Sequence, residues 1–240
     1  VGLGLGMVAA TAPARVLDGE KRKRVGKPET DPVGLLGKGV RVGILTGCVQ
    51  DGLLGRVNRA TGRVLEANGY EVVEVVGQGC CGAIHAHTGD LESARKLARK
   101  NVQAFEALKL GLVAINAAGC GATMKDYPHL LADDPDYAER AEDLGARVRD
   151  VSELLGSPGR PGDLGVPEAA GLRRGGTVRL RVTYDAPCHL LHAQRIAEEP
   201  LALLRSIPGL ELIPLPGHDE CCGGAGIYGI THPELGARIS

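Results

Sequence analysis

Mainly apolar runs and amphipathic stretches alternate along the chain from residue 40 onward. Residues 40–46, 71–76 and 112–116 are the short apolar runs that strands covered on both faces show. Residues 52–68 and 90–108, which lie between them, carry apolar side chains at helical spacing. Strand, helix, strand, helix and strand within about 80 residues predict a parallel sheet flanked by helices.

The spacing also predicts which side chains the helices bury. In residues 52–68 the inner face consists of Leu53, Leu54, Val57, Ala60, Val64 and Leu65. In residues 90–108 it consists of Ala94, Leu97, Ala98, Val102, Phe105 and Leu108. A third helix is predicted over residues 135–144.

The same pattern begins again in the last quarter of the chain. A strand is predicted at residues 178–184, a helix at 192–206 and a strand at 210–215. The fold class is therefore α/β, with two similar halves, each a small parallel sheet flanked by helices, and a truncated second half that lacks the third strand. We divide the chain into a lead-in of residues 1–39, a first domain of residues 40–156, a Pro/Gly-rich linker of residues 157–176 and an incomplete second domain of residues 177–240.

The cysteines repeat with the halves. Cys48 precedes Cys80-Cys81-Gly82 with 31 residues between, and Cys188 precedes Cys221-Cys222-Gly223 with 32 residues between. Cys120 follows the third strand of the first half. A duplicated unit that keeps its cysteines indicates a site.

Thiolates at strand ends indicate metal binding rather than disulfide bonding. The Cα atoms of adjacent cysteines lie about 3.8 Å apart, closer than the 4.4–6.8 Å that a disulfide favours. The carboxyl ends of parallel strands are where ligands collect, and Cys48, Cys80, Cys81 and Cys120 all fall there. Four thiolates suit an iron–sulfur cluster or zinc, and the wide spread of the ligands along the chain favours a cluster.

Composition argues against other partners. The chain has 28 basic and 29 acidic residues and a net charge of −1, so no strong field attracts nucleic acid or an anionic membrane. Aromatic residues make up 2% of the chain, which leaves no stacking platform for single strands. The apolar first ten residues are too short for a transmembrane segment and lack the charged start of a secretory signal.

The paired Cys–x₃₁₋₃₂–Cys-Cys-Gly motif resembles the duplicated cysteine-rich, or CCG, domain family. Members include the iron–sulfur subunit of glycolate oxidase, the lactate utilisation A protein and the B subunit of heterodisulfide reductase. Residues 45–50, residues 77–83 with His85, and residues 184–194 are most similar to the first of these. The resemblance implies [4Fe-4S] clusters held by Cys48, Cys80, Cys81, Cys120, Cys188, Cys221 and Cys222. It also implies electron transfer within a glycolate, or other 2-hydroxy-acid, oxidoreductase.

In such a complex, flavin-containing glycolate oxidase subunits would supply electrons and a quinone or another acceptor would receive them. The resemblance places the protein in the cytoplasm or at the inner face of the membrane. The family motif ends in Cys-x-x-Cys, whereas Thr123 follows Cys120 here, so a four-thiolate site is the expectation for the first half.

Two other readings stay open. One is a zinc-stabilised assembly module, with zinc at one of the sites, and the other is a catalytic subunit like that of heterodisulfide reductase. His189 and His192, close to Cys188, are the candidates for a catalytic role, and His85 and His87 follow the first Cys-Cys-Gly.

Overall fold

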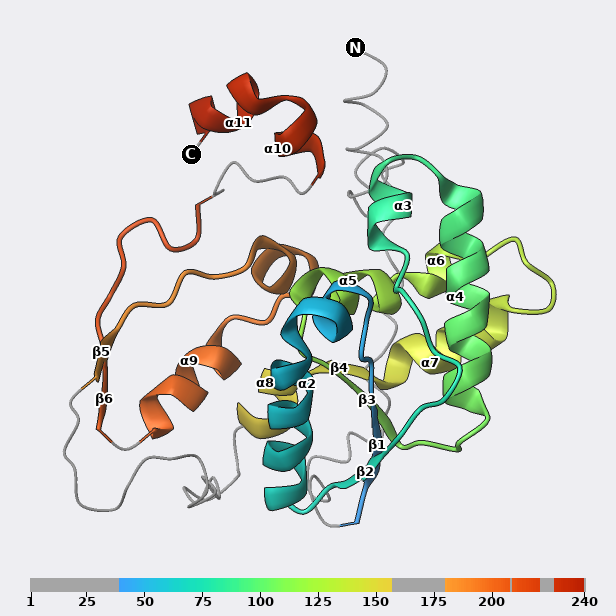
Figure 1. Cartoon of the computed structure of the whole chain (residues 1–240), viewed down its shortest axis with the longest axis horizontal. Coiled ribbons are helices and arrows are strands. Elements are labelled where there is room, and N and C mark those ends of the chain that lie inside the picture. The colour runs from blue at the N-terminus through green and yellow to red at the C-terminus, as the bar shows by residue number, and fades with distance from the viewer. Residues whose placement is uncertain (1–38, 157–179, 208, 221–226, 240) are drawn as a thin grey trace.

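The computed structural model describes residues 39–156, 180–207, 209–220 and 227–239 of the chain (Figure 1). The first part contains β1 (Arg41–Ile44), α2 (Val49–Ala67), β2 (Glu71–Val73), α3 (Ala83–His87), α4 (Leu91–Glu106), β3 (Leu112–Ile115), α5 (Ala118–Lys125), α6 (Tyr127–Leu130), α7 (Ala138–Arg147), β4 (Val148–Asp150) and α8 (Val151–Gly156). The second part contains β5 (Leu180–Val182), the π-helix η3 (His189–Ala193), α9 (Glu198–Ser206), β6 (Leu210–Leu212), α10 (Ile227–Thr231) and α11 (Pro233–Ile239). The predicted linker and, except for residue 39, the predicted lead-in lie outside the described residues.

Four parallel strands form the sheet of the first part, in the order β2-β1-β3-β4. Arg41 of β1 lies opposite Glu71 of β2, and Val42 of β1 lies opposite Leu112 of β3. All carboxyl ends therefore share one edge, which is uppermost in Figure 1. The predicted α/β class is confirmed. The pattern did not predict β4, which is three residues long and follows α7 without a turn.

Helices cover both faces of this sheet, so successive side chains of a strand enter different cores. Val113 of β3 belongs to the core that contains Phe105 of α4. Its neighbour Leu112 belongs to the core that contains Leu65 of α2. Both faces exclude water, and this explains why the central strands read as apolar runs rather than as alternating ones.

The second part repeats the strand pairing of the first. β5 and β6 are parallel, and Arg181 lies opposite Glu211 as Arg41 lies opposite Glu71. In both cases the two side chains form an ion pair, with Nε–Oε distances of 3.4 Å for Arg41–Glu71 and 3.7 Å for Arg181–Glu211. The strands before Cys48 and Cys188 thus hold the same topological position, as the duplication predicts.

The helix predicted over residues 52–68 begins earlier and is bent. It starts at Val49, and Leu54 has non-helical dihedral angles of φ −123° and ψ 24°. The predicted inner face is wrong at its start, since Leu53 is 81% exposed and Leu54 38% exposed. The bend turns this end of the helix out of the core, and Gly55, directly after Leu54, makes it less costly.

The single helix predicted over residues 192–206 is also wrong. The chain forms η3, turns at Arg195 with a positive φ of 59°, and begins α9 only at Glu198. Pro200 explains the late start, because proline lacks the backbone N–H of a helix interior but fits its first turn. The third helix of the first part is shifted as well, from the predicted residues 135–144 to α7.

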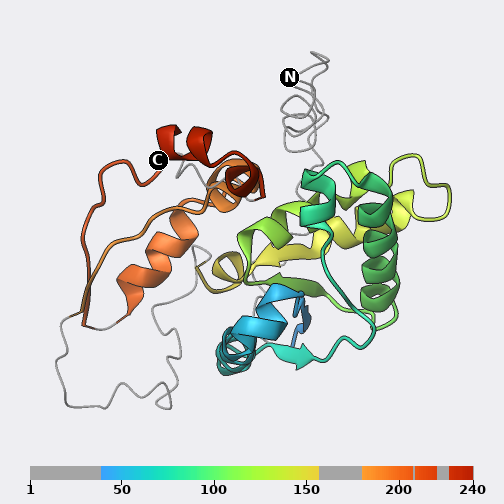
Figure 2. The same cartoon turned by 45° about the horizontal axis from the view of Figure 1, so that its top comes forward.

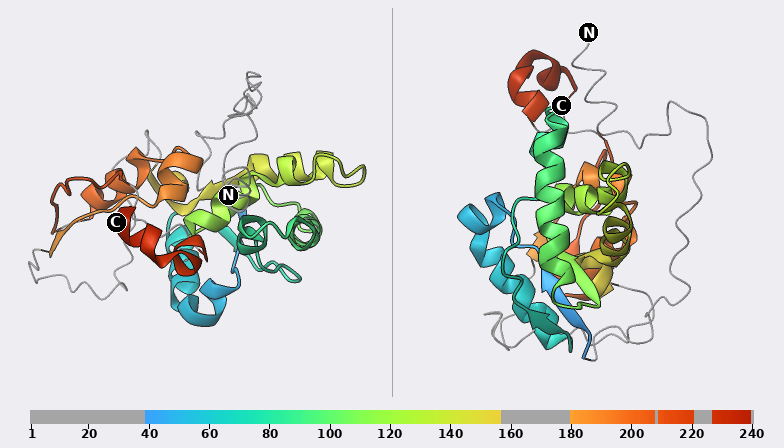
Figure 3. Two further views of the ribbon diagram at one scale, coloured as in Figure 1. Left: turned by 90° about the horizontal axis from the view of Figure 1, so that it is seen from above. Right: turned by 90° about the vertical axis from the view of Figure 1, so that its right-hand side faces the viewer.

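The two parts meet along two pairs of helices. α8 packs against α9, and α5 packs against η3 (Figure 2). A Cβ atom added to Gly156 would lie 2.7 Å from the carbonyl oxygen of Glu199, so only glycine lets these backbones approach so closely. Seen from above the carboxyl edge, the second part lies to one side of the first (Figure 3).

The longest helices of the described ranges are α2, with 19 residues, and α4, with 16. Asp90 caps the start of α4, and its side chain accepts a hydrogen bond from the backbone N–H of Ser93 at 3.1 Å. No helix in the part of the chain that the structure describes has both the length and the apolar character to cross a membrane.

Candidate metal centre

The four cysteines of the first part lie beyond the carboxyl ends of three neighbouring strands. Cys48 follows β1, Cys80 and Cys81 follow β2, and Cys120 follows β3, within the first turn of α5. The Sγ atom of Cys48 lies 3.4 Å from that of Cys80, and the Sγ atom of Cys81 lies 3.1 Å from that of Cys120. The structure therefore arranges the thiols that the sequence placed at one sheet edge as two contacting pairs. We call this group the first centre.

The first centre has a solvent side and a core side. Cys48 is exposed, and Cys80 and Cys120 are half-buried. Cys81 is 3% exposed and belongs to the core that contains Phe105. The adjacent residues Cys80 and Cys81 thus contact different thiols. Cys80 contacts Cys48 on the solvent side, and Cys81 contacts Cys120 on the core side.

The turn after the two cysteines requires glycine. Gly82 has a φ of 86°, which side chains with a Cβ atom rarely adopt, and its added Cβ would lie 3.3 Å from the carbonyl oxygen of Ala94. Its backbone N–H donates to the Sγ atom of Cys80 at 3.4 Å. The glycine therefore allows the chain to turn back over the first centre.

A buried polar pair holds the backbone that carries the two cysteines. Asn101 accepts a hydrogen bond from the N–H of Gly79 at 2.9 Å and donates to the carbonyl oxygen of Cys80 at 3.0 Å. Asn101 also donates to the hydroxyl of Tyr127 at 2.9 Å, and that hydroxyl donates to the carbonyl oxygen of Cys81 at 2.9 Å. Sequence reasoning missed both residues. The signal was an asparagine on the otherwise apolar inner face predicted for residues 90–108.

A second amide ties the same loop to β1. Gln78 accepts a hydrogen bond from the N–H of Thr46 at 2.9 Å and donates to the carbonyl oxygen of Ile44 at 3.0 Å. It thereby continues the pairing of β1 beyond the last strand residues. The loop that carries Cys80 is consequently fixed against the segment that leads to Cys48.

The thiols affect one another's pKa. Burial is the largest of the effects that raise the pKa of Cys80 to about 11. The pKa of Cys81 is raised, first because its thiol donates to Cys120 and then because it is buried. The same hydrogen bond lowers the pKa of Cys120. In the metal-free chain Cys80 and Cys81 are therefore neutral thiols at pH 7, and a metal must displace their protons.

Raising the pH from 9.0 to about 11 is expected to destabilise the metal-free chain through Cys80. Its pKa is raised on folding, so the folded chain retains a proton that the unfolded chain loses over this range. The stabilising contribution is complete below pH 9 and is lost as the pH approaches 11. Urea unfolding across this range should show a steeper loss for the wild type than for Cys80→Ser. Parallel curves for the two chains would contradict this expectation.

Two of the four candidate histidines meet between the parts. The ring of His87 in α3 and that of His189 in η3 lie edge to face, with centroids 5.4 Å apart. Burial, and then the proximity of His189, lowers the pKa of His87. His85 instead pairs with Asp90, with Nδ1 3.3 Å from a carboxylate oxygen, and His192 is exposed. His189 is therefore placed near the first centre, whereas His192 is not held by the interface.

The segment after Cys188 packs on the glycines that flank Cys120. An added Cβ at Gly119 would lie 3.0 Å from Nδ1 of His189, and one at Gly121 would lie 2.8 Å from Nε2 of Gln194. Gln194 also donates to the carbonyl oxygen of Ala118 at 2.9 Å. The second part thus covers the Cys120 side of the first centre. Cys221 and Cys222, predicted for the second site, lie outside the described residues.

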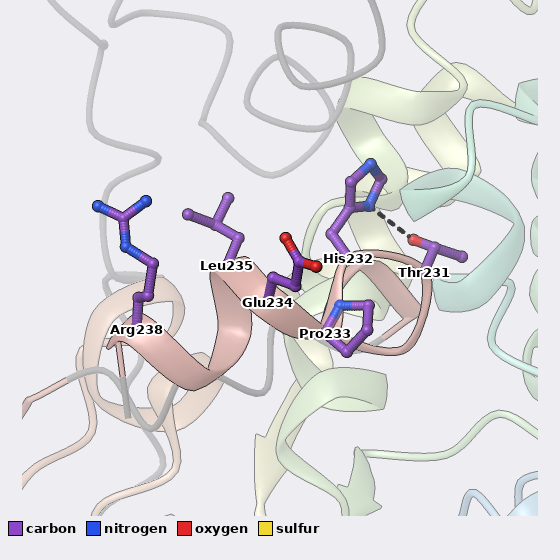
Figure 4. A pocket seen from close by; sticks show the side chains of 6 residues that line it. All are labelled: Thr231, His232, Pro233, Glu234, Leu235 and Arg238. Atoms are coloured by element: carbon purple, nitrogen blue, oxygen red, sulfur yellow. Dashed lines mark hydrogen bonds between the residues drawn. The ribbon is translucent and has the colours of Figure 1, made fainter.

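A hollow lies on α10 and α11 (Figure 4). Its lining residues are Thr231, His232, Pro233, Glu234, Leu235 and Arg238. Thr231 and His232 are joined by a hydrogen bond of 2.9 Å between Oγ1 and Nδ1. None of the six lining residues is a cysteine, so the hollow is not part of the first centre.

The model of the cysteine-rich (CCG) domain matches residues 42–125 and 182–240. These two segments cover more than half of the chain. The chain belongs to the CCG cysteine-rich domain family. The first matched segment contains Cys48, Cys80, Cys81 and Cys120, and the second contains the remaining three cysteines.

Several CCG proteins of known name are similar to this chain. The probable glycolate oxidase iron-sulfur subunit of Bacillus subtilis is 37% identical over 202 residues, which are 83% of this chain and 43% of that protein. The glycolate oxidase iron-sulfur subunit of Escherichia coli is 36% identical, over 83% of this chain and 47% of that protein. Lactate utilization protein A of Bacillus velezensis is 30% identical, over 83% of this chain and 79% of that protein. The chain thus spans less than half the length of the two glycolate oxidase subunits.

The donor atoms of the first centre suit the group that the CCG resemblance implies. Four thiols from three strand ends are the donor set of both [4Fe-4S] clusters and structural zinc. Their contacts are shorter than the edge of about 3.8 Å that Zn–S bonds of about 2.3 Å give in a tetrahedron. Within the described ranges, no three Cys, His, Asp or Glu side chains are spaced as ligands of one ion. Either group would require the two sulfur atoms of each pair to move apart.

Thr123 occupies the position where the CCG motif has its last cysteine. Its hydroxyl donates to the carbonyl oxygen of Gly119 at 2.9 Å, one turn earlier in α5. Threonine offers no thiolate, so the first centre of this CCG protein supplies four sulfur donors.

Proposed function

We propose that this chain is the cysteine-rich region of an iron–sulfur subunit in a glycolate oxidase-type complex. In this proposal the subunit passes electrons from a flavin-containing subunit to a quinone or another acceptor. The observation that carries the proposal is the meeting of Cys48, Cys80, Cys81 and Cys120 at the carboxyl edge of the first sheet. The names of the relatives supply the type of complex.

Cys48, Cys80, Cys81 and Cys120 would hold a [4Fe-4S] cluster, and Cys188, Cys221 and Cys222 would contribute to a second one. A bound cluster supplies one-electron transfer, which flavin and quinone chemistry both require. Zinc at one site is the alternative for the same donor set, and metal analysis separates the two. The burial of Cys81 supports the cluster reading, because a dry environment on one side helps to set a reduction potential.

The exposure of Cys48 gives the proposed direction of electron exchange. Its side of the first centre faces solvent, whereas the second part covers the Cys120 side. An electron partner would therefore approach next to Cys48. The side chains of Val49 and Leu53, which follow Cys48 in the sequence, are exposed and offer an apolar surface. We place the complex in the cytoplasm or at the inner face of the membrane.

A reduction experiment tests the proposal. The full chain is reconstituted with iron and sulfide under anaerobic conditions and mixed with the flavin-containing oxidase subunits. Glycolate should then bleach the visible absorption of the cluster, and a quinone should restore it. Mixtures without glycolate or without the flavin subunits are the controls. Reduction of the flavin with no change at the cluster would contradict the proposed electron path.

A further inference from the structure

We propose that Asn101 and Tyr127 are positioning residues of the first centre. By holding the backbone of residues 79–81 they keep Cys80 and Cys81 directed to two different thiol partners. This inference deepens the proposed function and rests on it wherever the bound group is concerned. The conformation of the thiols in the metal-free chain tests it independently.

The contacts reach three successive residues of one loop. Asn101 binds the N–H of Gly79 and the carbonyl oxygen of Cys80, and Tyr127 binds the carbonyl oxygen of Cys81, all at 2.9 or 3.0 Å. The side chains come from α4 and α6, so the loop is fixed from outside rather than by its own turn. The peptide groups between residues 78 and 79, 80 and 81, and 81 and 82 are consequently restrained.

The two side chains are also buried, and their hydrogen-bond donors all have partners. Asn101 and Tyr127 are both 0% exposed. Both amide hydrogens of Asn101 are donated, and the hydroxyl of Tyr127 accepts one hydrogen bond and donates another. A buried polar network in which each donor has a partner is rigid, and loss of one member leaves a carbonyl group unsatisfied. Loss of the Tyr127 hydroxyl would leave the carbonyl of Cys81 and one amide hydrogen of Asn101 without these partners.

The restraint matters because the two thiols have separate neighbours. Cys80 contacts Cys48 on the solvent side, and Cys81 contacts Cys120 on the core side. A small rotation of the Cys80–Cys81 peptide would move both sulfur atoms at once. Outer residues of this kind orient ligands and tune the bound group. Asn101 and Tyr127 touch backbone rather than sulfur, so they act through the cysteines.

The test compares two tyrosines that each donate a buried hydrogen bond to a distant backbone carbonyl. Tyr127→Phe removes the bond to Cys81 and the acceptor of one Asn101 bond, and the control Tyr70→Phe removes the bond of 3.0 Å to Leu154 on the other face of the sheet. In the metal-free chain, alkylation of Cys81 followed by mass spectrometry should be about tenfold faster in Tyr127→Phe. Tyr70→Phe should leave this rate unchanged once global unfolding, measured in urea, is taken into account. Asn101→Ala, which frees two backbone groups, should show a larger increase than Tyr127→Phe.

A second readout uses the reconstituted chain. The electron paramagnetic resonance spectrum of the reduced cluster should change in Tyr127→Phe and match the wild type in Tyr70→Phe. Equal effects of the two variants, or no effect of Tyr127→Phe on Cys81 alkylation, would overturn the positioning role. If the wild type takes up no iron, the proposed function fails, while the alkylation rates still decide the role of the pair.

Discussion

The Cys81→Ser variant is expected to lose the metal group of the first centre. Cys81 is the most buried of its four thiols, and it contacts Cys120 at 3.1 Å. A serine hydroxyl keeps its proton at neutral pH and is a poor replacement for a soft thiolate ligand. Iron and sulfide per chain after anaerobic reconstitution, together with the visible absorption, should fall to the level of the second site.

Met124→Leu is the matched control for this experiment. Met124 is another fully buried sulfur-containing side chain of the same core, and it is not one of the four proposed ligands. A volume-conserving change of this kind usually costs less than about 1.5 kcal/mol and should leave the iron content unchanged. Wild-type iron in Cys81→Ser, or an equal loss in Met124→Leu, would show that Cys81 is not a ligand.

Gly121→Ala is expected to weaken the packing of the second part on the first centre. The new Cβ would lie 2.8 Å from Nε2 of Gln194, whose amide is held by a hydrogen bond to Ala118. The side chain must leave this position and lose that bond, so we expect a loss of about 1–3 kcal/mol in the free energy of unfolding. Urea unfolding of the metal-free chain measures it.

A second substitution separates this clash from a general helix effect. In Gly121→Ala/Gln194→Ala the obstructing side chain is gone, so the double variant should be destabilised by less than the sum of the single variants. Gly52→Ala is the control, because an added Cβ there has nothing within 4 Å and alanine favours a helix. Additive effects of Gly121→Ala and Gln194→Ala would mean that the two residues do not contact each other in solution.

The sequence predicted what depends on repeating patterns. Apolar runs located β1, β2 and β3, and the parallel arrangement followed from their alternation with helices. The repeated cysteine spacing predicted the similar pairing of β1–β2 and β5–β6. The placement of the four cysteines at one edge followed from the strand order, because residues after neighbouring parallel strands share an edge, whereas their arrangement as two pairs did not.

Other features depend on single contacts that no period reveals. Leu53 and Leu54 fit the helical spacing, but the bend at Leu54 turns them to solvent. Asn101 interrupts an apolar face, and only the fold shows that it binds the cysteine loop. The role of Gly121 depends on Gln194, which is distant in sequence and belongs to the other part.

Metal analysis of the chain purified without oxygen decides whether the four thiols of the first centre hold a cluster or zinc. We expect about four iron and four sulfide for a filled first centre, with little zinc, and loss of that amount in Cys81→Ser. One zinc ion per chain without sulfide, lost in the same variant, would contradict the cluster and make the four thiols a structural zinc site.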